Sequence, residues 1–406
     1  MADPDIPIAY ATTDPSGFVP VAPPPSHAPG GGRPSLAQAQ TATGRSSRVM
    51  LPKQKSKVMG RAEVTAMQEQ GFTKGLAEAM TRNNAAFPLR IWVVDNSGSM
   101  AQNDGHRIVE TAHSDNVKIV GCTRWREIQE TVNYHAQMAA LLQAPTVFRM
   151  LNDPGAASGP QQFSVCERGM ENIDEDVTIA LQCMQNTTPG GVTPLAQHVR
   201  EIRENVTSMW DDLRRDGTKV AIVLATDGLP TDYRGICSEA QKRDFVTALR
   251  SLEGLPVWVV IRLCTDEDEV VNFYNDLDSQ LELSLEVLDD FVEEASEVNE
   301  NNPWLNYGLA LHRCREMGYH NRLFDLLDER MLTVDELRDF FFLLFGASAF
   351  DGVPDAQADW KGFCKSVSAM LKKEKKQWNP RTKKVEPWID MKKLQKCYKK
   401  GNCTIM

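Results

Sequence analysis

Short apolar stretches alternate with longer amphipathic stretches between residues 86 and 300. The apolar stretches cover residues 89–94, 219–225 and 256–263, the last two of which are rich in β-branched side chains, and residues 283–288 supply a last strand-like stretch. The amphipathic stretches place apolar residues three and four positions apart, which predicts helices over 123–142, 194–213, 238–252 and 267–277. Strands that are apolar on both faces are typical of a parallel sheet covered on both sides. We therefore predict a doubly wound α/β fold, with a mostly parallel sheet and helices on both faces.

The chain before this region has a composition that does not favour folding. Residues 1–60 are rich in Pro, Gly, Ser and Ala, so they bury too little apolar surface to offset the entropy of ordering. We expect a disordered segment over 1–60, followed by the α/β domain over 61–300, with its core at about 86–300.

After residue 300 the strand patterns stop and helical patterns continue. Three stretches have the spacing of helices, at residues 304–317, 322–329 and 334–345. Thr333 and Glu336 form a capping-box sequence at the start of the third stretch. We expect a helical appendage over 301–360 and a basic tail over 361–406.

The net charge of −10 conceals a strong asymmetry along the chain. Residues 361–406 hold 14 Lys and Arg against 3 Asp and Glu, a net charge of +11. Residues 263–312 hold 14 acidic residues and no Lys or Arg. The two segments therefore either serve separate electrostatic roles or meet.

Several features of the composition indicate a cytoplasmic protein. The nine cysteines are scattered without a Cys-x-x-Cys pair, which is typical of a reducing compartment and argues against a disulfide framework or a zinc site. No apolar run approaches the roughly 18 residues that a membrane span needs. The start of the chain lacks the basic and apolar regions of a secretory signal.

Three polar segments lie where an α/β sheet binds its ligands, outside the carboxyl ends of strands and at a helix start. The first is Asp-Asn-Ser-Gly-Ser at 95–99, the second Gly-Gly-Val-Thr-Pro-Leu at 190–195, and the third Ala-Thr-Asp-Gly-Leu-Pro-Thr-Asp at 225–232. Their candidate ligands are two carboxylates and three hydroxyls, on Asp95, Ser97, Ser99, Thr193 and Asp227. Such oxygens suit Mg²⁺, or alternatively Mn²⁺ or Ca²⁺, and five groups leave one octahedral position for an incoming carboxylate.

The three segments together resemble the metal-ion-dependent adhesion site of von Willebrand factor A domains. The resemblance covers about residues 86–300 and implies direct metal contacts from Ser97 and Ser99. It implies that Thr193 binds directly or through water, and that Asp95 and Asp227 ligate the metal or hold its waters. Val192 departs from the family pattern, and insertions are expected around 101–121 and 152–172.

No sequence feature favours catalysis. Motifs for a nucleophile elbow, a phosphate-binding loop or a zinc protease are missing from the sequence. We therefore expect a protein that is not an enzyme and binds a protein ligand through an Asp or Glu, with no small-molecule substrate and no nucleic acid. Two alternatives remain open: a metal-dependent enzyme or enzyme subunit of hydrolase or chelatase type, and a module whose metal only stabilises loops.

The last four residues, Cys-Thr-Ile-Met, resemble a prenylation box with Cys403 as the lipid acceptor. One lipid chain anchors weakly, but a chain next to a polybasic segment anchors stably on an anionic membrane surface. The basic residues upstream of Cys403 are Lys392, Lys393, Lys396, Lys399 and Lys400. Cys397 is a possible second lipid site. We expect peripheral attachment to a cytoplasmic membrane surface.

Replacing Cys403 with Ser should move the protein from the membrane to the soluble fraction, because the polybasic segment alone anchors weakly. Replacing the tail lysines with Gln should weaken attachment but still permit lipidation. Fractionation with intact-mass measurement tests both variants. A wild-type C-terminus without added mass, in cells with active prenyltransferases, would make the motif a coincidence.

Overall fold

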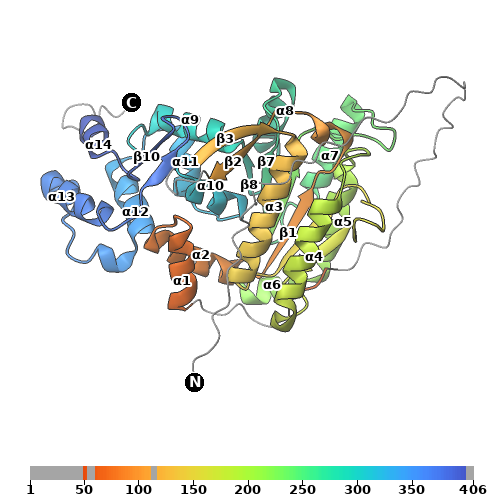
Figure 1. Ribbon diagram of the computed structural model, residues 1–406, viewed down its shortest axis with the longest axis horizontal. Coiled ribbons are helices and arrows are strands. Elements are labelled where there is room, and N and C mark those ends of the chain that lie inside the picture. Colours follow the sequence, from red (N-terminus) through yellow and green to blue (C-terminus); the bar gives the residue numbers. More distant parts are fainter. Residues whose placement is uncertain (1–48, 53–59, 111–116, 399–406) are drawn as a thin grey trace, which may run out of the picture. The chain divides into compact units, whose positions relative to one another are not determined.

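The computed structural model describes residues 49–52, 60–110 and 117–398 (Figure 1). Most of the segment expected to be disordered, residues 1–60, lies outside this part of the chain. The proposed lipid acceptor Cys403 and the lysines Lys399 and Lys400 also lie outside it.

A six-stranded sheet forms the centre of the α/β domain, with the strand order β5-β4-β1-β6-β7-β8. The strands are β1 (Leu89–Val94), β4 (Thr146–Met150), β5 (Gln162–Val165), β6 (Val220–Thr226), β7 (Val257–Leu263) and β8 (Leu285–Leu288). All neighbours pair in parallel except β4 and β5. The prediction of an α/β fold with a mostly parallel sheet is confirmed, whereas β4 and β5 were not predicted.

The helices of this region are α3 (Arg124–Leu141), α4 (Ile173–Asn186), α5 (Leu195–Ser208), α6 (Trp210–Asp216), α7 (Glu239–Arg250), α8 (Asp268–Gln280) and α9 (Phe291–Asn301), with short 3₁₀ turns η1 (Gly98–Ala101) and η2 (Met170–Asn172). The four predicted helical stretches are present as α3, α5 with α6, α7 and α8, whereas α4 and α9 were not predicted. The helix predicted over 194–213 is divided at Met209, where α5 ends and α6 begins.

Alternate residues of β1 enter two separate hydrophobic clusters. Ile91 and Val93 pack with side chains of α5, α7 and α8. Trp92 and Val94 pack with side chains of α3 and α4. Neighbouring residues of a strand point to opposite faces, so the two clusters cover opposite faces of β1. This burial explains why the strand is apolar throughout.

The expected insertion at 101–121 is an antiparallel hairpin of β2 (Gly105–Glu110) and β3 (Val117–Cys122). The hairpin is tied to α3 by a hydrogen bond of 2.8 Å from the His106 backbone N–H to Glu127 Oε2. An ion pair of 3.1 Å between Arg107 and Glu130 adds a second link.

The C-terminal region folds together with the first two helices. Its elements are α1 (Arg61–Glu69), α2 (Lys74–Ala86), α10 (Leu309–Glu316), α11 (Arg322–Glu329), α12 (Val334–Phe345), η3 (Ala347–Ala349), α13 (Trp360–Leu371), β9 (Gln377–Asn379), β10 (Lys384–Glu386) and α14 (Met391–Cys397). The predicted capping box of Thr333 and Glu336 is present at α12. Side chains from α1 and α2 share one hydrophobic cluster with those of α10 to α14.

Two expectations for this region were wrong. Strands do not stop at residue 300, because β9 and β10 pair as a hairpin. The basic segment is folded as far as Tyr398, with Phe363, Trp388 and Leu394 buried. The helix predicted over 304–317 begins only at Leu309, because Leu305 pairs with Ile389 in a β-bridge.

Acidic residues of the 263–312 segment pair with arginines of the neighbouring elements. Buried Arg315 contacts Glu286 at 2.6 Å, Asp328 at 3.2 Å, and Glu294. Across the described residues, no ion pair joins the acidic segment 263–312 to the lysines after residue 360. The two segments meet instead through backbone contacts, at the bridge between Leu305 and Ile389 and the hydrogen bond from the Asn306 N–H to the Trp388 carbonyl.

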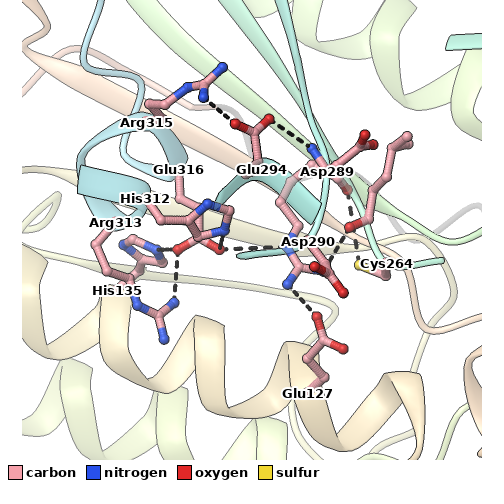
Figure 2. A network of polar contacts seen from close by, with 12 residues as sticks. Glu127, His135, Cys264, Asp289, Asp290, Glu294, His312, Arg313, Arg315 and Glu316 are labelled. Carbon is pink, nitrogen blue, oxygen red and sulfur yellow. Dashed lines mark hydrogen bonds and ion pairs between the residues drawn. The ribbon is translucent and has the colours of Figure 1, made fainter. Parts of the chain in front are cut away.

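A second buried network surrounds Glu316 (Figure 2). Its carboxylate contacts His135 Nε2 at 3.0 Å and Arg313 Nη1 at 2.8 Å. Burial opposes the ionised form, but Arg313, His312 and His135 hold the pKa of Glu316 well below its usual range. Burial lowers the pKa of His135 to about 4 despite Glu316. The network therefore joins α10 to α3 through an ionised carboxylate and a neutral histidine.

Replacing Arg315 with Met should lower the free energy of unfolding by about 3 kcal/mol at pH 8, because it leaves buried carboxylates without their cation. Urea unfolding measures the loss, with the exposed Arg214→Met as the matched control.

The loss should be smaller at pH 5.5. Burial raises the pKa of Glu286 to about 7 and of Glu294 to about 8, although Arg315 opposes the rise. The folded state thus binds these protons more tightly than the unfolded state, so stability falls as pH rises from about 4.5 to 8. Without Arg315 the pKa of both carboxyls rises further, so the free energy of unfolding falls more steeply with pH. An equal loss at both pH values would contradict the assignment of the effect to these carboxylates.

Candidate metal centre

Parallel pairing of β1 with β6 places the two candidate aspartates at the same edge of the sheet. Val94 lies beside Ala225 in register, and Asp95 and Asp227 follow these strands. The Asp95 backbone N–H donates a 2.9 Å hydrogen bond to the Ala225 carbonyl. Both side chains are almost completely buried, Asp95 at 0% and Asp227 at 2% exposure.

A chain of side-chain hydrogen bonds links the first polar segment to the third. Ser99 Oγ donates to Asp227 Oδ1 at 2.8 Å, and the hydroxyls of Ser97 and Ser99 lie 3.0 Å apart. Since the single hydroxyl hydrogen of Ser99 goes to Asp227, Ser97 is the donor to Ser99. Asp95 accepts from the Ser97 backbone N–H at 2.8 Å and from Thr226 Oγ1 at 2.6 Å.

Thr193 belongs to the same group of oxygens. A Cβ atom built on Gly228 would lie 3.8 Å from Thr193 Oγ1 and 3.9 Å from Ser99 Oγ, so both hydroxyls flank the glycine that follows Asp227. The Thr193 backbone N–H donates to Thr231 Oγ1 at 2.9 Å, and the Thr193 carbonyl accepts from the Thr231 N–H at 3.0 Å. The second and third polar segments are thus fastened to each other.

Asn152 holds the loop that contains the additional residue Val192. Its side chain donates to the Val192 carbonyl at 2.8 Å and accepts from the Val192 N–H at 3.2 Å. Gly191 has a φ of +97°, and a Cβ there would lie 2.5 Å from Asn152 Oδ1. Only glycine fits this position. The Gly190 N–H also donates to the Asn96 carbonyl at 2.7 Å, which ties the loop to the first segment.

Burial of two carboxylates so close together disfavours the charge on both. Burial and the neighbouring Asp227 raise the pKa of Asp95 to about 6. Burial also raises the pKa of Asp227, although hydrogen bonds from Ser99 and Arg124 oppose the rise. A divalent cation between them would offset this repulsion. The electrostatics of the group therefore fit a bound metal.

The structure adds Arg124, a residue that sequence reasoning missed. Its buried guanidinium donates to Asp227 Oδ2 at 3.0 Å, to Asp104 Oδ1 at 2.7 Å and to Glu267 Oε1 at 2.7 Å. Burial opposes its charge, but these three carboxylates hold the pKa of Arg124 above its ordinary value. Arg124 donates to Oδ2 of Asp227, whereas Oδ1 accepts the hydrogen bond from Ser99. Nothing in the local sequence at the start of α3 signals this role.

The five predicted residues therefore lie together and offer oxygen donors from three fastened loops. This donor set fits a hard divalent cation such as Mg²⁺. A second acidic group comprises Glu294, Glu297 and Asp328, whose ligand atoms lie within 4.8 Å of one another. Arg315 contacts both Glu294 and Asp328, as Arg124 contacts Asp227, so each of the two acidic groups contains a buried arginine.

Three of the five lysines proposed to contact a membrane lie in the described part of the chain. Lys392, Lys393 and Lys396 are exposed on α14. Cys397 packs against the C-terminal hydrophobic cluster, and burial raises the pKa of its thiol. This environment disfavours Cys397 as a second lipid site. None of the helices in the described part of the chain is long and apolar enough to cross a bilayer.

Comparisons with known proteins add little. No family model matches the chain, and no curated protein matches it. Among solved structures, a mutant of the PilB minor pilin from Streptococcus sanguinis is similar over 50% of this chain and 57% of that chain, with 12% identity and a TM-score of 0.33. The match spans little more than half of the pilin chain.

Replacing Asp227 with Asn should weaken Mg²⁺ or Mn²⁺ binding by at least about 100-fold, because it removes one of two charged ligands. The fold should persist, since Arg124 keeps Asp104 and Glu267 as partners. Calorimetric titration tests the affinity. Asp232→Asn, in the same loop but outside the oxygen group, is the matched control. Unchanged affinity in Asp227→Asn would remove Asp227 from the site.

Proposed function

We propose that the chain is a von Willebrand factor A-like protein with a doubly wound α/β domain, which binds a protein partner through a divalent metal. The observation that carries the proposal is the convergence of Asp95, Ser97, Ser99, Thr193 and Asp227 at one edge of the sheet. These residues come from three separate loops. The edge of an α/β sheet outside the strand ends is the usual place for a ligand.

Two kinds of ligand would hold Mg²⁺ in this site: the carboxylates supply negative charge, and the hydroxyls supply neutral oxygens. Ser97 keeps its lone pairs free, because its hydrogen points to Ser99. Asp95 is fixed by Thr226 and by a backbone N–H, and Asp227 by Arg124. A bound Mg²⁺ would supply an electrophilic centre with an open position for a carboxylate oxygen. An Asp or Glu of the partner fits that position.

We propose binding rather than catalysis because the oxygen group is built from ligands and their supports. Each carboxylate is engaged by hydroxyl, backbone or guanidinium donors. In the proposed site the remaining lone pairs of both carboxylates would face the metal, which leaves neither carboxylate free to act as a general base beside a reacting group. A prenyl group on Cys403, with the lysines of α14, would hold this binding module at a cytoplasmic membrane surface.

Replacing Thr193 with Ala should abolish capture of the metal-dependent partner, while Thr207→Ala, exposed on α5, should not. The full chain is used as bait, with Mg²⁺ or with a chelator, and bound proteins are identified by mass spectrometry. Partners should be lost on chelation and should return with Mg²⁺. A candidate partner should also lose binding when one surface Asp or Glu is changed to Asn or Gln.

Three results would contradict the proposal. The first is a set of partners that chelation leaves unchanged. The second is partner binding that survives in Thr193→Ala at saturating Mg²⁺. The third is metal-dependent turnover of a small substrate, which would favour the enzyme alternative.

A further inference from the structure

A large cavity lies in the C-terminal region, formed by residues that the metal centre does not use. Its volume is about 1020 Å³, at the upper end of the range for ligand pockets. It is lined by the segment before α10, the end of α13, the β9–β10 hairpin and the start of α14. Buried apolar side chains line part of the wall, including Trp304, Leu305 and Ile389.

Five cationic side chains line the same cavity and are exposed to solvent. They are Lys372, Lys376, Arg381, Lys392 and Lys393. Within the described residues, none of the five side chains forms an ion pair or a hydrogen bond. These cations come from α13, the hairpin and α14, so the positive charge is spread along the cavity.

The three acidic residues of the lining, in contrast, are already engaged. Glu386 accepts from Asn379 Nδ2 at 2.9 Å. Asp390 caps α14 by accepting from the Lys392 and Lys393 backbone N–H groups at 2.9 and 3.1 Å. Glu374 accepts a hydrogen bond from the Lys74 backbone, and burial raises its pKa. The cavity therefore offers free positive charge and no free negative charge among its described lining residues.

The lining also contains polar atoms that the described residues leave unsatisfied. Asn306 donates through Nδ2 to the carbonyls of Gln377 and Glu386, but its Oδ1 is buried with no hydrogen-bond partner in this part of the structure. Trp304 Nε1 is likewise buried without one. Both atoms have almost no exposed surface, so the exposed cations, and not these atoms, would meet a ligand in the cavity.

We propose that this cavity binds an extended acidic peptide segment of a partner protein. The apolar wall would take its aliphatic side chains, and the lysines and Arg381 would take its carboxylates. Charge spread over three elements suits a chain with repeated carboxylates better than a single small anion. A concave wall that includes Trp304 suits a peptide better than the flat surface of a bilayer.

The test is fluorescence anisotropy with the full chain, with EDTA present so that the metal centre cannot contribute. The probe is a fluorescein-labelled Glu-Asp-Leu-Glu-Asp-Leu peptide at near-physiological salt. The control peptide has Gln and Asn in place of Glu and Asp. The wild-type chain should bind the acidic probe and not the neutral one.

Charge reversal should locate the binding. The double variant Lys392→Glu with Lys393→Glu should lower the affinity for the acidic probe by at least about tenfold. The double variant Lys372→Glu with Arg381→Glu, which changes other parts of the lining, should lower it by a similar factor. Lys361→Glu with Lys365→Glu changes the net charge equally but lies outside the cavity lining, near the start of α13 and about 10 Å or more along the helix from Lys372. This control should weaken binding by less than about twofold, because salt screens distant exposed charges.

All four residues of the cavity pairs are exposed, so these variants should fold, and circular dichroism checks that they do. Equal weakening in the control pair would overturn the proposal in favour of general attraction to a basic surface. Lack of probe binding by the wild-type chain would also overturn it. Phosphatidylserine vesicles form a further arm. Vesicle binding that depends on the cavity lysines, without peptide binding, would assign the cavity to a membrane instead.

Discussion

The central strands β1 and β6 are completely buried and pair in parallel, with Val94 beside Ala225. Parallel strands end at the same edge of a sheet. This pairing therefore brings Asp95 and Asp227 together although they lie 132 positions apart in the chain. Ser99 then donates to Asp227, the Ser97 hydroxyl lies beside that of Ser99, and the Thr193 hydroxyl lies beside Gly228. The geometry of the candidate metal centre is therefore a consequence of how the core of the sheet packs.

Buried charges outside the oxygen group depend on the same packing. Arg124 joins Asp227 to Asp104 and Glu267, and Arg315 joins Glu286, Glu294 and Asp328. A buried arginine removed from its carboxylates, or the reverse, leaves an uncompensated charge in a region of low dielectric. Such contacts make the loops around the metal centre and the helices after residue 300 depend on the sheet for their positions.

The two proposed binding sites would select similar acidic ligands by different means. The metal centre would present one concentrated positive charge to a single carboxylate. The C-terminal cavity would present several separate cations to a run of carboxylates, with apolar surface between them. Acidic surface on a partner would be favoured at both sites, which is consistent with a chain whose basic residues are concentrated after residue 360.

The sequence by itself determined the features that depend on neighbouring residues. Continuous apolar runs predicted β1, β6 and β7, the capping box placed the start of α12, and the polar segments after strands identified the five oxygen donors. The tertiary structure decided what depends on contacts between distant residues. Arg124 meets Asp227 only when α3 packs beside the sheet, and the lysine-rich segment folds only because Trp388 and Leu394 find a hydrophobic cluster built partly by α1 and α2. Local sequence patterns do not predict such partners, because burial and charge pairing depend on residues that meet only in the assembled core.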